Sequence, residues 1–181
     1  MNDRHVLVGV SGGIAAYKSA MLVSQLVQAG AQVQVILTAA AREFIGAATF
    51  AALTGRPVPS EVFDPNAYPL GAHITLAEQA ELLCVAPATA NVIAKTAHGL
   101  ADDLLSTTLL SFTGKVVFAP AMNCEMWEKP AVQRNVDQLR KDGITIVDPE
   151  VGWLSCRKQG AGRMAPPERI FAAIADLLNV P

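Results

Sequence analysis

Short and almost wholly apolar segments recur along this chain, and each leads into a stretch with helical character. The apolar segments are His5–Val10, Gln32–Leu37, Leu82–Ala86, Lys115–Ala119 and Ile144–Val147. The helical stretches are 14–28, 44–55, 90–97, 102–111, 130–141 and 167–178. Strands that are apolar at nearly every position are typical of parallel sheets buried on both faces. The pattern therefore predicts an α/β fold of three layers, in which a doubly wound, mostly parallel sheet lies between two layers of helices.

The chain has the length of one domain, and no part of it has the composition of a linker. Its 181 residues fit a single domain that spans 1–181. Two stretches lack a strand or helix pattern, Pro57–Leu70 and Asp148–Pro167. The second is rich in glycine and basic residues, and we expect it to be irregular and mobile.

The composition excludes several classes of function. Hydrophobic residues make up 51% of the chain and charged residues 17%, which favours buried contacts between subunits, although a tightly covered sheet explains part of the excess. The net charge is −2 and no basic cluster is present, so we expect no nucleic-acid partner. No apolar run approaches the roughly 18–20 residues that cross a bilayer, so we expect no membrane association.

Cysteine usage points to a reducing compartment. Cys84, Cys124 and Cys156 are odd in number and widely spaced, which favours neither a disulfide framework nor a zinc site, and we expect no metal. The segment Met1–Arg4 leads directly into the first strand and leaves no room for a signal peptide. We therefore expect the protein to be cytoplasmic.

The first chemical signal is the glycine pair in Ser11-Gly12-Gly13-Ile14, between the first strand and the first helix. Glycines at this place let backbone N–H groups approach a phosphate at the positive end of the helix. The spacing differs from that of dinucleotide sites, and no acidic residue lies between Asp3 and Glu43 to hold a ribose. The loop favours a ligand with one phosphate over NAD, and the alternative is a tight turn without a ligand.

Two further polar loops follow later strands. Pro87-Ala88-Thr89-Ala90-Asn91 opens a helix, and Pro120-Ala121-Met122-Asn123 follows the apolar run that ends at Ala119. Each loop taken alone is explained by helix capping or by a turn. In open α/β sheets, however, the carboxyl ends of the strands border one ligand crevice. The three loops together therefore predict a shared binding site.

Two single residues have candidate catalytic chemistry. His73 follows the first irregular stretch, although a lone histidine is more often a surface or core residue than a catalyst. Cys156 lies in the glycine-rich segment, where an inert buried thiol would be out of place. A free thiol is mostly protonated near neutral pH and can donate a proton. Cys84 is predicted to pack within its strand.

In combination these motifs resemble the flavin-containing cysteine decarboxylase family, and within it the phosphopantothenoylcysteine decarboxylases of coenzyme A biosynthesis. The resemblance extends from Val8 to about Ile174 and rests on the order and joint presence of five motifs. The motifs are residues 9–18, 73–74, 87–91, 120–127 and 154–164. The family implies a Rossmann/flavodoxin-like fold that binds FMN at an interface between copies of the chain. It also implies a homo-oligomer, either a trimer or a dodecamer of trimers.

The resemblance assigns roles to the residues that match these motifs. The implied FMN-binding residues are Ser11, Gly12, Gly13, Ile14, Thr38, Thr89, Ala90, Asn91 and Ala121. The implied substrate-binding residues are Asn123, Trp153, Leu154 and Ser155. Asn123 would hold the substrate carboxylate, and 153–156 would form a flap. His73 would be the active-site base, and Cys156 would donate a proton.

The implied reaction is FMN-dependent decarboxylation of 4′-phosphopantothenoylcysteine to 4′-phosphopantetheine. The thiol-bearing carbon is oxidised to a thioaldehyde, CO2 leaves to give an enethiol, and reduction with a proton gives the saturated thiol. The small-molecule substrate comes from a phosphopantothenate–cysteine ligase, which is fused in many bacterial relatives and separate in others. One alternative is an oxidative peptidyl-cysteine decarboxylase, which stops at the enethiol; another is a non-catalytic flavoprotein regulatory subunit.

The chain departs from the family pattern in two motifs. Thr89 and Val92 replace a serine and a threonine, and the Thr89 change keeps a hydroxyl group. Cys156 is followed by Arg157 and Lys158, where the family usually has glycine and aspartate. These two cations are therefore candidates for contact with a substrate phosphate.

Overall fold

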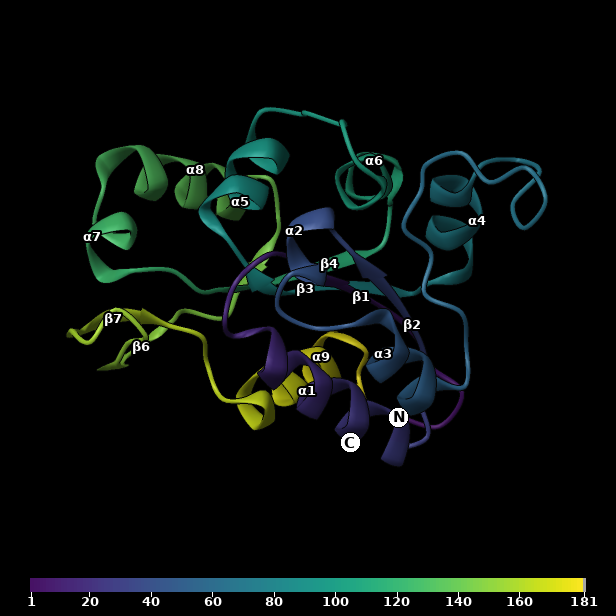
Figure 1. Ribbon diagram of the computed structural model, residues 1–181, viewed down its shortest axis with the longest axis horizontal. Helices are drawn as coiled ribbons and strands as arrows, with labels where there is room; N and C mark the ends of the chain where they lie inside the picture. Colours follow the sequence, from purple (N-terminus) through teal and green to yellow (C-terminus); the bar gives the residue numbers. More distant parts are fainter. Residues whose placement is uncertain (181) are drawn as a thin grey trace.

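A computed structural model describes residues 1–180 and contains a five-stranded sheet at its centre (Figure 1). The strands are β1 (His5–Val10), β2 (Gln32–Leu37), β3 (Leu82–Ala88), β4 (Lys115–Pro120) and β5 (Thr145–Ile146). They are all parallel and lie in the order β2-β1-β3-β4-β5. This arrangement confirms the predicted doubly wound sheet. It also places the reversal of strand order between β1 and β3.

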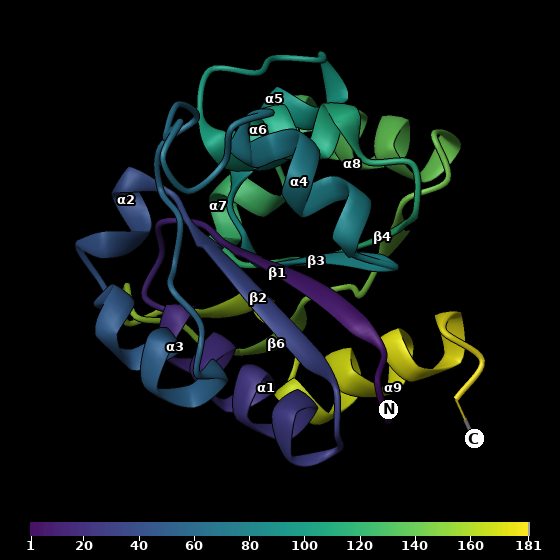
Figure 2. The ribbon, with the colours of Figure 1, turned by 90° about the vertical axis from the view of Figure 1, so that its right-hand side faces the viewer.

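Helices cover both faces of the sheet (Figure 2). One layer contains α1 (Ala16–Gln28), α3 (Ala47–Thr54) and α9 (Pro167–Leu177). The other contains α4 (Ala72–Gln79), α5 (Ala90–Ala97), α6 (Leu104–Ser111) and α8 (Pro130–Lys141). Two single-turn helices, α2 (Ala39–Arg42) and α7 (Cys124–Trp127), follow β2 and β4. Among residues 1–180, no helix has the length and apolar character needed to cross a membrane.

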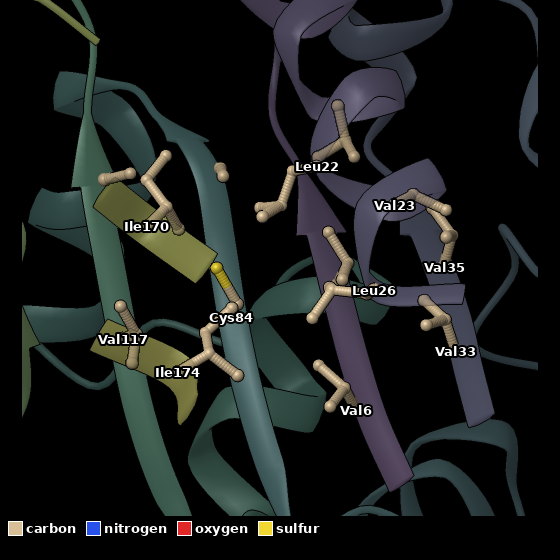
Figure 3. Packing of buried hydrophobic residues seen from close by; sticks show 14 of the residues in the cluster. Val6, Leu22, Val23, Leu26, Val33, Val35, Cys84, Val117, Ile170 and Ile174 are labelled. Atoms are coloured by element: carbon tan, nitrogen blue, oxygen red, sulfur yellow. The ribbon is translucent and has the colours of Figure 1, made fainter. Parts of the chain in front are cut away.

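The strand side chains divide between two apolar clusters, one on each face of the sheet. Figure 3 shows the cluster between the sheet and helices α1 and α9, where Val6 and Cys84 of the strands lie near Leu26 and Ile174 of the helices. Cys84 is fully buried, and this burial raises the pKa of its thiol to about 12. A thiol in that state is a packing group, as the sequence predicted.

The glycine-rich segment forms a defined structure, so the expectation of an irregular stretch there was wrong. Strands β6 (Glu150–Trp153) and β7 (Gln159–Arg163) pair as an antiparallel hairpin. The glycines let β7 lie directly against the segment after β4. A Cβ at Gly162 would come within 2.4 Å of the Met122 carbonyl oxygen, and the Met122 N–H donates to the Gly162 carbonyl at 2.9 Å. Backbone contact, which leaves no side-chain periodicity, holds the hairpin in place.

Candidate active site

A cavity of about 700 Å³ opens at the carboxyl edge of the sheet, beside the ends of β1, β3 and β4. Ligands of doubly wound proteins bind where the strand order reverses, which here is between β1 and β3. The hairpin β6–β7 and the short helix α7 lie together beside this edge (Figure 1). The three polar loops predicted from the sequence therefore do meet at one place.

Ser11 ties the loop after β1 to the loop after β3. Its buried hydroxyl donates to the Pro87 carbonyl oxygen at 2.6 Å and accepts from the Thr89 N–H at 3.1 Å. The Thr89 side chain in turn caps α5 by accepting from the Val92 N–H. These bonds fix the relative positions of the two loops, so the cavity wall is formed before any ligand binds.

The loop Gly12–Ile14 has the properties of a phosphate cradle. The N–H groups of Gly12, Gly13 and Ile14 donate to no backbone carbonyl within residues 1–180, and all three residues line the cavity. A Cβ at Gly12 would lie 2.4 Å from the Ala40 Cβ, so only glycine lets the loop approach α2 this closely. Free N–H groups at the start of α1 suit an anion, because the helix dipole also favours negative charge there.

Asn123 and Cys156 are in direct contact at the mouth of the cavity. The Asn123 Nδ2 lies 3.1 Å from the Cys156 Sγ, across 33 positions of sequence. The Asn123 Oδ1 accepts from the Glu125 N–H at 2.8 Å and so caps α7. This cap orients the amide nitrogen toward the thiol. An amide donor and a thiol proton donor thus face the same space.

The structure brings together every sequence-predicted binding residue and one of the two predicted catalytic residues. The cavity is lined by Ser11, Gly12, Gly13, Ile14, Thr38, Thr89, Ala90, Asn91, Ala121, Asn123, Trp153, Leu154, Ser155 and Cys156. Within residues 1–180 no group of three or more His, Cys, Asp or Glu side chains has the arrangement of a metal site.

His73 is not among these residues. It lies on α4, which packs against α6 and is on the opposite side of the molecule from the hairpin β6–β7 (Figures 1 and 2). Its Nδ1 is buried and has no hydrogen-bond partner among residues 1–180. A single copy of the chain therefore does not place His73 in the cavity.

The cavity also contains charged residues that the sequence did not reveal. Lys18 is 9% exposed, and its Nζ donates to the Met164 carbonyl at 2.9 Å; burial, followed by the nearby Arg163, lowers its pKa. Lys95 and Asp103 also line the cavity, and they form an ion pair of 2.9 Å. Lys18 stands inside the first motif, but nothing local distinguishes an inward-pointing lysine from an exposed one.

The two cations after Cys156 do not enter the cavity. Lys158 forms an ion pair with Glu125 of α7, and Arg157 is exposed and is not one of the lining residues. The expectation that these side chains meet a substrate phosphate therefore finds no support in the geometry. The Lys158–Glu125 pair instead joins the hairpin turn to α7.

The fold and the cavity define a flavodoxin-type α/β protein with a preformed site for a phosphorylated ligand at its topological switch point. Comparison of the sequence with models of protein families agrees with this class of protein and gives a specific family within it. The Flavoprotein family model matches residues 1–179, so the chain belongs to the Flavoprotein family.

Curated relatives give a more specific similarity. The chain is 49% identical over 170 residues to the coenzyme A biosynthesis bifunctional protein CoaBC of Bacillus subtilis (strain 168), covering 94% of this chain and 42% of that protein. It is 49% identical over 176 residues to CoaBC of Mycobacterium tuberculosis (strain ATCC 25618 / H37Rv), covering 97% of this chain and 41% of that protein. The chain thus spans about two-fifths of the length of these relatives.

Solved structures agree with this similarity. A PPC decarboxylase with a cysteine-to-serine mutation, complexed with pantothenoylaminoethenethiol, superposes with a TM-score of 0.89 at 28% identity and covers 98% of this chain and 100% of its own. The FMN-dependent cysteine decarboxylase SpaF superposes with a TM-score of 0.82 at 36% identity, covering 97% and 95%.

Proposed function

We propose that this protein is an FMN-dependent carboxy-lyase that converts 4′-phosphopantothenoylcysteine to 4′-phosphopantetheine in coenzyme A biosynthesis. The observation that carries the proposal is the contact between Asn123 and Cys156 at the mouth of a cavity with a phosphate cradle. The similarity to CoaBC proteins and to PPC decarboxylase supports the choice of substrate. In this proposal the enzyme acts in the cytoplasm and receives its substrate from a phosphopantothenate–cysteine ligase, fused or separate.

The residues of the cavity fit FMN. The free N–H groups of Gly12, Gly13 and Ile14 would hold its phosphate, with Thr38 beside them. Thr89, Ala90 and Asn91 would border its ring, together with Ala121. When bound, FMN supplies a two-electron acceptor and donor.

Asn123 and Cys156 would act on the substrate itself. The Asn123 Nδ2 donates to the substrate carboxylate and so positions the carbon–carbon bond that breaks. The Cys156 thiol then gives its proton to the enethiol carbon as the saturated thiol forms. Trp153, Leu154 and Ser155 cover the substrate, which keeps water from the reacting carbon. A positioned acid of this kind typically contributes a factor of about 10²–10⁴ in rate.

We also propose that the complete site needs a second copy of the chain, in a trimer or an assembly of trimers. The cavity rim contains the exposed apolar side chains of Ile14 and Tyr17, and Met21 extends the same face of α1. Around His73, the side chains of Leu70 and Ile74 are also exposed. A neighbouring copy that covers the rim with this face of α4 would bring the imidazole of His73 to the cavity as the base.

The decisive experiment is product analysis with FMN-loaded protein and phosphopantothenoylcysteine. We expect CO2 release and a saturated thiol by mass spectrometry. We expect Cys156→Ser to release CO2 but to accumulate the enethiol, because saturated product forms about 10²–10⁴-fold more slowly. Cys124→Ser is the control, since Cys124 is a buried neighbour outside the cavity lining.

Other outcomes would select another function. A stable enethiol from the unmodified protein, with peptide substrates preferred, would identify a peptidyl-cysteine decarboxylase. An FMN-loaded protein that releases no CO2 from either substrate would be a non-catalytic flavoprotein subunit.

A further inference from the structure

Arg163 is an exposed cation that lines the cavity and has no side-chain partner among residues 1–180. Lys18 donates to the Met164 carbonyl, and Lys95 is 2.6 Å from Asp102 and 2.9 Å from Asp103, so both lysines have partners. The Arg163 guanidinium makes no side-chain hydrogen bond and no ion pair within 4.0 Å in the described part of the chain, residues 1–180. An arginine with five unused N–H donors at the edge of a ligand cavity can accept a ligand anion without breaking a protein contact.

The hairpin leaves a space in which the Arg163 side chain lies. Arg163 is on β7, and its side chain passes over Gly152 of β6. A Cβ at Gly152 would lie 3.0 Å from the Arg163 Cδ and 3.2 Å from its Nη1. The glycine thus leaves room for the arginine on its own face of the hairpin, and both Arg163 and Trp153 line the cavity. Glu150 is the ladder partner of Arg163, but its carboxylate remains beyond ion-pair distance.

Arg163 belongs to a different element from the cofactor's proposed phosphate site. That site consists of N–H groups on the loop after β1, whereas Arg163 lies on the hairpin that carries the substrate-covering residues Trp153 and Leu154. A planar guanidinium binds a phosphate through two parallel hydrogen bonds and discriminates strongly against a neutral group. The substrate of the proposed reaction has two anionic groups, the carboxylate and the phosphomonoester at the far end. The Asn123 amide would hold the carboxylate, so the phosphomonoester is the anion that still needs a cationic partner.

We propose that Arg163 binds the terminal phosphate of the substrate and makes the enzyme selective for phosphorylated over dephosphorylated substrates. This inference rests on the proposed function and deepens it. The recognised chemistry is a phosphomonoester dianion, which both the substrate and FMN contain, so the experiment must distinguish the two. Arg163 takes the role that the sequence indicated for Arg157 and Lys158.

The test uses the full chain loaded with FMN and measures the affinity for 4′-phosphopantetheine and for pantetheine by calorimetry. We expect the unmodified protein to bind the phosphorylated ligand more tightly. Arg163→Met should weaken that binding by about 10- to 100-fold, the range for a lost charge-assisted contact, and leave pantetheine binding unchanged. In turnover, KM for the phosphorylated substrate should rise while kcat stays constant, because the contact is equal in ground and transition states.

Two further variants show whether position or charge matters. Arg157→Met removes an exposed arginine from the same hairpin and should leave both affinities unchanged. Gly152→Ala keeps every charge but adds the methyl group that displaces Arg163. It should weaken the binding of 4′-phosphopantetheine but not of pantetheine, and by a smaller factor than Arg163→Met does. Arg163→Lys should recover part of the affinity. An equal effect of Arg157→Met and Arg163→Met would overturn the proposal.

The remaining outcomes separate the sources of the phosphate. If Arg163→Met weakens the binding of FMN but not of riboflavin, the arginine binds the phosphate of the cofactor and the proposal fails. It also fails if the unmodified protein does not distinguish 4′-phosphopantetheine from pantetheine. If that discrimination depends on Arg163 but no CO2 is released from phosphopantothenoylcysteine, Arg163 keeps its role as phosphate ligand and the proposed reaction is the part that fails.

Discussion

At the scale of single residues, two adjacent glycines differ in what they contribute. A Cβ at Gly12 would meet the Ala40 Cβ at 2.4 Å and the Ala40 carbonyl carbon at 2.8 Å. A Cβ at Gly13 would meet only the Thr89 Cγ2, at 3.7 Å, which is an ordinary contact. The first glycine is therefore required by packing against α2, whereas packing alone would tolerate alanine at the second.

This difference gives a prediction about stability. Gly12→Ala should lower the free energy of unfolding by about 1–3 kcal/mol, because backbone must move to relieve the overlap. Gly13→Ala should change it by no more than about 0.5 kcal/mol. Urea denaturation of the two variants measures both values. Equal losses for the two would show that the loop is held by something other than its contact with Ala40.

At the scale of elements, α5 and α6 are joined through the start of α6. The Asp103 Oδ1 accepts from the Ser106 N–H at 2.8 Å, and the Ser106 Oγ accepts from the Asp103 N–H at 3.1 Å, which is a complete capping box. Lys95 of α5 binds the other carboxylate oxygen. Burial alone would raise the pKa of Asp103, but the hydrogen bonds from Ser106 and Lys95 outweigh it and lower the pKa.

The lowered pKa makes this junction sensitive to acid. Because the folded state favours the carboxylate, the contribution of Asp103 to the free energy of unfolding is complete above the ordinary pKa of 3.8. That contribution is lost as the pH falls through the lower pKa of the folded state. Asp103→Ala should lower the free energy of unfolding by about 1–2 kcal/mol at pH 7. Asp103→Asn keeps the cap and should lower the free energy of unfolding by less. This difference from the unmodified protein should shrink as the pH falls toward about 3. Asp137→Asn, at an exposed pair with Arg140, is the control; a deficit independent of pH would contradict the assignment.

At the scale of the whole molecule, the candidate catalytic residues are divided between two sides of the chain. Cys156 and Asn123 meet at the hairpin, whereas His73 lies on α4 at the opposite side. If all three act in one reaction, the imidazole must come from another copy. In that case each copy gives a base to one site and receives one from another copy.

Mixing two inactive variants tests this arrangement. His73→Asn and Asn123→Ala should each lose activity alone. When they are expressed together, about a quarter of the sites should combine an intact pocket with an intact histidine, and activity should return in proportion. If the residues acted within one copy, no mixed assembly would contain a complete site and activity would stay absent. The state of assembly is checked by light scattering.

Local sequence was sufficient for the sheet and for the meeting of the three polar loops at one cavity, whereas the individual binding roles came from the family resemblance and stay predictions. Apolar strands such as Leu82–Ala86 indicate a sheet that is buried on both faces. Polar loops that follow such strands meet at one edge of the sheet, because parallel strands share a direction. For the same reason, the positions of Ser11, Thr89 and Asn123 could be predicted from their place after a strand.

Tertiary structure alone decided the rest. The hairpin β6–β7 is held by backbone contact at Gly162, which leaves no periodic signal. The roles of Lys18 and Arg163 depend on which cations find partners, and those partners lie far away in sequence. Sequence periodicity records which face of an element is buried, and so it determined the layers and the edge where the ligand binds. It does not record distances between elements, so only the folded chain could separate His73 from the cavity and leave Arg163 at the cavity without a partner in the part of the chain that the structure describes.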